Sequence, residues 1–184
     1  GWEALATDRE DLDVADAAAA AAAIACTAPD AVVHLAAQSS VGAAQRDPER
    51  AWRVNYAGAR NLLAALVRHA PRARLLLVGS GEVYGPLEDG AAPFGEAAPL
   101  RPASLYGRSK AAADLLGRAY AARGLAVVRV RAFNHTGPGQ SPDFVLASFA
   151  KQLVEIEKSK LDPVLHAGNL ESTRDFSDVR DVVA

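Results

Sequence analysis

Short runs of consecutive apolar residues recur along the chain, and residues that interrupt regular structure bound each of them. Such runs lie at 31–35, 75–78 and 126–130. They lack the alternation of apolar and polar positions that marks a strand with one wet face, so they predict strands buried on both faces. Shorter stretches at 3–7 and 164–166 are also predicted to be strands.

Between these runs the apolar positions follow the longer period of a helix. The pattern predicts helices over 13–28, 48–69, 104–123 and 144–158, and a further helix that begins at 179–184. Aspartate, serine or proline begins several of them, and proline or glycine ends them. Strands that alternate with helices predict an α/β fold, in which a parallel sheet carries helices on both faces.

The carboxyl ends of the strands are where a sheet of this kind binds its ligands. We therefore expect the functional loops at 6–9, 36–42, 79–85 and 132–140. Residues 85–103 hold four prolines and three glycines, which predicts a long surface loop. Loops of that length in compact domains often carry function.

Composition narrows the class of protein. The 184 residues begin with glycine and include no methionine, so we expect a piece of a longer protein. A net charge of −2 and the lack of an apolar run of about 18 residues argue against nucleic-acid and membrane partners. The lone Cys26 predicts no disulfide and a reducing, cytoplasmic location. No group of histidine, cysteine and aspartate has the spacing of metal ligands.

One set of residues points to acid–base chemistry. Tyr106 and Lys110 are four residues apart on a predicted helix, so they share one face of it. Ser80 follows a predicted strand whose carboxyl end should open on the same cleft. A neighbouring ammonium lowers the pKa of a phenol, which favours its use as an acid or base. The hydroxyl of a serine can hold the oxygen that receives the proton.

Six motifs surround these residues, in the order and at the spacing of the extended short-chain dehydrogenase/reductase family. They are HLAAQSS at 34–40, VNYAG at 54–58, SGEVYG at 80–85, PASLYGRSK at 102–110, RAFNHTGPGQ at 131–140 and RDFSDVRD at 174–181. The chain resembles the branch of that family whose members are epimerases, dehydratases and reductases of nucleotide sugars.

The resemblance implies a Rossmann-type, doubly wound parallel sheet that is incomplete. The first strand and the Gly-rich pyrophosphate loop of the family would precede the chain. Residues 1–135 would form a partial NAD(P)-binding domain with the catalytic residues, and 136–184 would begin a smaller nucleotide-sugar-binding lobe.

The family pattern also assigns roles to the acid–base residues. Tyr106 would donate a proton to the substrate, Lys110 would lower the pKa of Tyr106 and hold the nicotinamide ribose, and Ser80 would orient the reacting oxygen. Asn55 resembles a structural asparagine beside the active site, whereas His34 ends a buried strand and is interpreted as a core residue.

Cofactor residues are implied by the same resemblance. The residues expected to contact the dinucleotide are Asp13, Val14, Leu35, Ala36, Ala37, Tyr106 and Lys110. Asp8 would favour a free ribose 2′-hydroxyl and Arg9 a 2′-phosphate, so we expect NADP, with NAD as the alternative.

The substrate implied by the resemblance is a GDP-linked sugar, which Ser80, Gly81, Glu82, Asn134 and Arg174 would bind. Dehydratases of the family carry an acid or a serine where Gly81 stands, so Gly81 favours a reductase that converts the C4 ketone of GDP-4-keto-6-deoxymannose to GDP-rhamnose. Two alternatives stay open: a GDP-mannose 4,6-dehydratase or other nucleotide-sugar dehydratase or 4-epimerase, and a fragment without catalysis.

The two long helices predicted at 48–69 and 104–123 form the subunit interface in this family, which implies a homodimer. A run of alanines at 111–113 would permit close approach of the helices.

Overall fold

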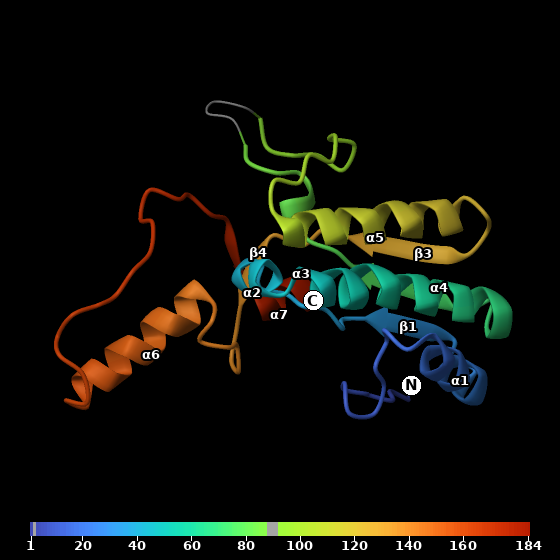
Figure 1. Ribbon diagram of the computed structural model, residues 1–184, viewed down its shortest axis with the longest axis horizontal. Helices are drawn as coiled ribbons and strands as arrows, with labels where there is room; N and C mark the ends of the chain where they lie inside the picture. The colour runs from blue at the N-terminus through green and yellow to red at the C-terminus, as the bar shows by residue number, and fades with distance from the viewer. Residues whose placement is uncertain (2, 88–91) are drawn as a thin grey trace. The chain divides into compact units, whose positions relative to one another are not determined.

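The computed structural model describes residues 1, 3–87 and 92–184, and these divide into two compact units, Gly1–Ala132 and Phe133–Ala184 (Figure 1). Part of the predicted loop at 85–103 lies outside the described residues. The elements of the first unit are α1 (Ala17–Thr27), β1 (Ala31–His34), α2 (Val41–Arg46), α3 (Pro48–Ala51), η1 (Trp52–Ala57), α4 (Gly58–His69), β2 (Arg74–Val78), η2 (Gly81–Val83), α5 (Leu105–Ala121) and β3 (Ala126–Val130). Those of the second unit are β4 (Asn134–Thr136), α6 (Val145–Glu157), β5 (Phe176–Asp178) and α7 (Val179–Val183).

A parallel sheet in the order β1-β2-β3 forms the centre of the first unit, which confirms the predicted α/β class and its three apolar strands. The strand predicted at 3–7 is wrong, because these residues pair with no strand among the described residues. The strand predicted at 164–166 is also wrong. There the side-chain amide of Gln152 bonds both the backbone N–H and the carbonyl of His166, in place of a neighbouring strand.

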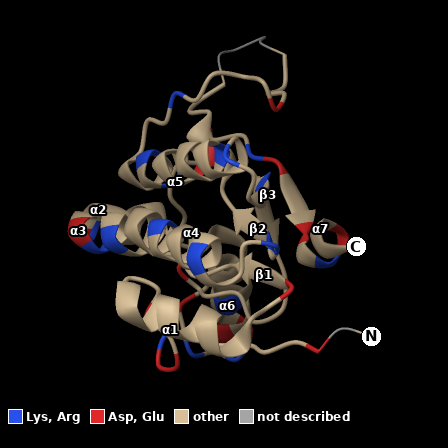
Figure 2. Ribbon diagram, turned by 90° about the vertical axis from the view of Figure 1, so that its right-hand side faces the viewer, with Lys and Arg blue, Asp and Glu red and all other residues tan. Residues whose placement is uncertain are grey.

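Helices α1, α4 and α5 lie side by side along one face of this sheet (Figure 2). Leu75 and Leu77 of β2 point into their shared core. The opposite face is not covered by the described residues: Val33 is 57% exposed and Val128 is 58% exposed, on either side of Leu76 in register. In the described residues these strands are thus not buried on both faces: only His34 of β1 and Leu75 and Leu77 of β2 are buried, and no residue of β3 is.

The two long predicted helices form nearly as expected. The helix at 48–69 runs as α3, η1 and α4, with Asp47 capping its first turn and a π-helical turn at η1. The helix at 104–123 forms as α5, whose start Ser104 caps by accepting from the N–H of Gly107 at 2.9 Å. The helix predicted from residue 13 begins only at Ala17, because Asp16 caps it there.

Regular structure also appears inside three of the predicted loops. The loop at 36–42 runs into α2, which Ser40 caps, and the loop at 79–85 contains the 3₁₀ turn η2. The loop at 132–140 contains β4, which pairs with β5 in parallel. Helices α6 and α7 confirm the two C-terminal helix predictions. No helix of the described residues is both long and apolar enough to cross a membrane.

Candidate active site

The loop that follows β2 is held in place by the loop that follows β3. The N–H of Gly81 donates to the carbonyl of Ala132 at 2.7 Å. Ser80 caps the 3₁₀ turn η2, because its Oγ accepts from the N–H of Glu82 at 3.2 Å. Ser80 is thereby fixed just beyond the carboxyl end of β2, where a parallel sheet binds ligands.

Helix α5 brings the second part of the site to this turn. Tyr106 and Lys110 are both buried, at 8% and 7% exposure, and the side chain of Ser80 acts on the phenol of Tyr106 and lowers its pKa. Gly107 permits the close approach of the helix: a Cβ there would lie 2.7 Å from the carbonyl oxygen of Glu82. The structure therefore brings together Ser80, Glu82 and Tyr106.

The pKa of Tyr106 shifts in the direction opposite to the one expected from the sequence. Burial raises it, the hydrogen bond with Ser80 lowers it, and the charge of Glu82 raises it, with a net rise above 10.0. Lys110 is not among these causes. Its Nζ donates instead to the carbonyl of Val78 at 2.7 Å. The expectation that Lys110 lowers the pKa of Tyr106 is therefore wrong for this structure.

Lys110 and His34 are buried basic side chains whose pKa values are lowered. Burial lowers the pKa of Lys110 to about 8. Burial, together with the charge of Lys110, lowers the pKa of His34 to about 4. His34 is 5% exposed at the end of β1, so a neutral imidazole in the core is the stable form near neutral pH.

A buried amide joins the loop after β1 to helix α5. Asn55, in the π-helical turn η1, accepts from the N–H of Gln38 at 2.8 Å and donates to its carbonyl at 3.2 Å. It also donates to Ser109 Oγ at 2.9 Å, and Ser109 donates to the carbonyl of Tyr106 at 2.8 Å. Single π-helical turns recur at functional sites.

Five of the residues expected to contact the cofactor line one cavity of about 380 Å³. They are Asp13, Val14, Leu35, Ala36 and Ala37. The side chains of Tyr106 and Lys110, the other two, are not part of this lining. The cavity lies in the first unit, beyond the end of β1.

The chemistry of this cavity suits a dinucleotide. Gln38 Oε1 is buried and has no hydrogen-bond partner among the described residues, so it is an acceptor for a donor on a bound molecule. Arg9 and Arg50 line the same cavity, and guanidinium groups bind phosphate well. The residues present therefore fit the cofactor that the resemblance implies.

The remaining residues predicted to bind substrate belong to the second unit. Asn134 lies in β4, opposite Phe176 of β5. Arg174 is exposed, and its Nη1 donates to the neighbouring carbonyl of Thr173 at 3.0 Å. A cavity of about 280 Å³, lined by residues 135–140 and Val179, lies within the same unit.

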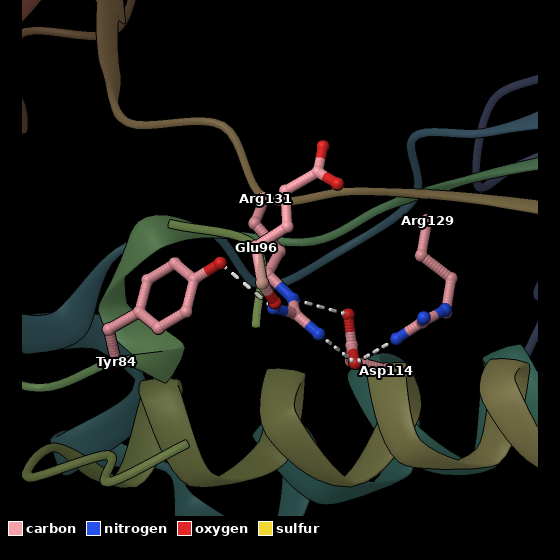
Figure 3. Close-up of polar contacts among 5 residues, drawn as sticks. All are labelled: Tyr84, Glu96, Asp114, Arg129 and Arg131. Carbon is pink, nitrogen blue, oxygen red and sulfur yellow. Dashed lines mark hydrogen bonds and ion pairs between the residues drawn. The ribbon is translucent and has the colours of Figure 1, made fainter. Parts of the chain in front are cut away.

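Sequence reasoning missed a buried ion cluster beside the site. Asp114 of α5 is bonded by Arg129 and Arg131, and Arg131 also reaches Tyr84 (Figure 3). The sequence carried a signal for it: Arg129 and Arg131 are two residues apart at the end of a predicted strand, and arginines that are partly buried need an anionic partner. Tyr106, Lys110 and Asp114 also recur at every fourth position of α5.

The family model described as GDP-mannose 4,6 dehydratase matches residues 7–184. The chain belongs to this family. It is 40% identical over 157 residues to a GDP-6-deoxy-D-mannose reductase of Pseudomonas aeruginosa, a match that covers 85% of this chain and 52% of the relative. It is 41% identical over 127 residues to a dTDP-glucose 4,6-dehydratase of Streptomyces griseus, covering 68% of this chain and 38% of the relative.

Solved structures agree with the fold. The structure of RMD from Pseudomonas aeruginosa complexed with NADPH matches at a TM-score of 0.86 and 36% identity, over 98% of this chain and 60% of that one. A UDP-glucose 4-epimerase of Thermus thermophilus in complex with NAD matches at 0.80 and 31%, over 93% of this chain and 56% of that one. The fold is thus that of the extended short-chain dehydrogenases/reductases. The matched region spans 52% of the Pseudomonas aeruginosa reductase and 38% of the Streptomyces griseus dehydratase.

Proposed function

We propose that the protein is an oxidoreductase that reduces the C4 ketone of GDP-4-keto-6-deoxymannose with NADPH, which gives GDP-rhamnose. The observation that carries the proposal is the placement of Ser80 just beyond the end of β2, where its side chain acts on the buried phenol of Tyr106 and lowers its pKa. It gives a proton donor and a second hydroxyl at one point, which is what the reduction of a ketone needs. The similarity to a GDP-6-deoxy-D-mannose reductase supports the choice of substrate.

In this proposal Tyr106 is the acid. Its raised pKa keeps the phenol protonated near neutral pH, so a proton is available when charge develops on the substrate oxygen. Ser80 donates a hydrogen bond to the same oxygen and orients the ketone. Lys110 lies one turn along α5, with an ammonium whose pKa is only about 8, and would turn from the carbonyl of Val78 to the ribose of the bound cofactor.

The residues around the larger cavity would hold the cofactor, which supplies the hydride when bound. Asp13 and Val14 would bind its adenine end, and the small side chains of Ala36 and Ala37 would let the backbone approach it. Arg9 and Arg50 would meet phosphate groups, and a contact of Arg9 with a ribose 2′-phosphate would favour NADP over NAD.

The residues proposed to bind the substrate are those named from the sequence. Ser80 and Gly81 would lie against the reacting part of the sugar, and Glu82 would bond its hydroxyls. Asn134 and Arg174 would contact the nucleotide portion, where the exposed guanidinium of Arg174 suits a diphosphate.

A dehydratase is the second candidate, and a specific observation favours it. The charge of Glu82 raises the pKa of Tyr106, so a carboxylate that could serve as a base lies within electrostatic range of the phenol. The matching family model is also described as a GDP-mannose 4,6 dehydratase, and several relatives are dehydratases. Against it, glycine at position 81 supplies no acid for the hydroxyl that leaves.

Product analysis separates the two candidates. With GDP-4-keto-6-deoxymannose, a reductase consumes one NADPH for each sugar converted, whereas a dehydratase acting on GDP-mannose consumes none. The Tyr106→Phe variant of the active protein should turn over about 10²–10⁴ times more slowly, because only the donated proton is lost. Its affinity for NADPH should stay nearly unchanged. Turnover of this variant near that of the unmodified protein would remove Tyr106 from the mechanism.

A further inference from the structure

A cluster of four side chains, which we call the Arg131 cluster, ties helix α5 to the loops above the sheet (Figure 3). It consists of Tyr84, Asp114, Arg129 and Arg131. Asp114 is 3% exposed and lies one turn beyond Lys110 on the same face of α5. The cluster therefore shares a helix face with the candidate acid–base residues.

Two arginines hold the carboxylate at one end of the cluster. Arg131 binds Asp114 with two hydrogen bonds, from Nε at 2.9 Å and from Nη2 at 3.0 Å. Arg129 adds a third, from Nη1 at 2.7 Å. Burial alone would raise the pKa of Asp114, but the bond from Arg131 and the charges of both arginines outweigh it and lower the pKa. Asp114 is thus a fully paired, ionised group.

The free edge of the Arg131 guanidinium reaches the loop that carries Ser80. Its Nη1 donates to Tyr84 Oη at 2.8 Å and to the carbonyl of Glu96 at 2.8 Å. Its central carbon lies 5.2 Å from the centre of the Tyr84 ring, and that ring stacks on Phe94. Only a guanidinium has enough donors in one plane to make all these bonds at once.

Tyr84 comes directly after the 3₁₀ turn that Ser80 caps. Residues 131 and 132 therefore hold this turn at both ends: the carbonyl of Ala132 accepts from Gly81, and Arg131 donates to Tyr84. Between these two anchors lies Glu82. Both anchors therefore act on the turn that carries Ser80 and Glu82, the two residues of this turn that shift the pKa of Tyr106.

We propose that Arg131 is a positioning residue, which through Tyr84 and Asp114 holds Ser80 and Glu82 at the hydroxyl of Tyr106. Its printed bonds go to Asp114, Tyr84 and Glu96 and not to Ser80, Tyr106 or Lys110, and its role in catalysis rests on the function proposed above. The geometry of the turn is independent of that function.

The first test measures the hydroxyl of Tyr106 directly, in the 184-residue chain and without substrate. Tyrosine rings labelled with ¹³C are titrated by NMR, and the Tyr106→Phe variant identifies the signal of Tyr106. In Arg131→Lys and in Tyr84→Phe we expect Tyr106 to titrate at higher pH than in the unmodified chain. Ser80 lowers the pKa of Tyr106 more than Glu82 raises it, so displacing the turn that carries both residues should raise this pKa. Tyr84→Phe removes a single hydroxyl and keeps the stacked ring, so it stays informative if Arg131→Lys does not fold.

Arg129→Gln is the matched control. It removes one bond to Asp114 but touches neither Tyr84 nor Glu96 through any bond of the cluster, so stability should fall while the Tyr106 titration stays in place. An unchanged titration in both Arg131→Lys and Tyr84→Phe would overturn the proposal. So would an equal change in Arg129→Gln, because it would mean that the cluster acts only on stability.

The second test uses turnover in the active protein. Arg131→Lys and Tyr84→Phe should lower kcat about tenfold and shift its pH profile, while the KM for NADPH stays constant. A loss of affinity for NADPH with unchanged kcat would contradict the proposal. If the unmodified protein does not reduce the keto sugar, the proposed function fails, and the titration still decides the role of Arg131.

Discussion

At the scale of single residues, the environment of a side chain sets its chemistry more than its identity does. Burial shifts the pKa of Tyr106, of Lys110 and of His34 in the direction that favours the neutral form of each side chain. The spacing of Tyr106 and Lys110 was readable from the sequence. The direction of the shift in the pKa of Tyr106 was not, because its largest cause is burial in the folded chain, with a smaller effect of the charge of Glu82.

His34 should make the folded state sensitive to mild acid. Its pKa is about 4 in the folded chain against 6.5 for a histidine in water, so between these values the unfolded chain binds more protons. Stability is then lost as the pH falls through this range, by at most about 3 kcal/mol. In His34→Asn, the free energy of unfolding in urea should differ less between about pH 7 and about pH 4.5 than in the unmodified chain. The control is His69→Asn, at the exposed end of α4, which should keep the full pH dependence.

At the scale of elements, helix α5 and the turn η2 are matched to each other. Ser104 caps the helix and the hydroxyl of Ser80 caps the turn. Because Gly107 has no side chain, the helix can pack directly against the backbone of the turn. Caps and periodicity are local signals, so both helix boundaries were predicted to within two residues. The contact between them joins positions 25 residues apart and had no local signal beyond the glycine itself.

Gly107→Ala should therefore disturb the site even though alanine favours a helix. The new Cβ would lie 2.7 Å from the Glu82 carbonyl and 3.1 Å from Ser104 Oγ, and neither can move freely. We expect a net loss of about 1–2 kcal/mol, after alanine's better helix preference offsets part of the strain. Unfolding in urea measures the loss. Gly95→Ala is the control, because nothing lies within 4 Å of its added Cβ; equal stability of the two variants would refute the argument.

At the scale of the whole molecule, the helical stretch from η1 to α4 and helix α5 carry exposed apolar side chains. Trp52, Val67 and Leu115 are 39%, 51% and 49% exposed. Aromatic and large aliphatic groups of this kind are typical of the centre of a subunit interface. We propose, as the family pattern implies, that these helices form a homodimer.

Light scattering tests the dimer. Leu115→Arg should convert the dimer into a monomer, because the buried centre of an interface tolerates an unpaired charge poorly. Leu170→Arg is the control: it places the same charge at a side chain that is 77% exposed in the second unit and outside these helices. A protein that is monomeric without any substitution, or a Leu115→Arg variant that remains dimeric, would contradict this assignment.

The sequence by itself determined the α/β class, the three paired strands, the long helices and the residues that meet at the end of β2, because apolar periods, caps and motif spacing are all local. It misplaced strands at 3–7 and 164–166, since an apolar stretch becomes a strand only where a partner offers its backbone groups. Tertiary structure alone decided the pKa of Tyr106, the bonds of Arg131 and which face of the sheet is covered. Each of these depends on charges and surfaces that distant parts of the chain bring together.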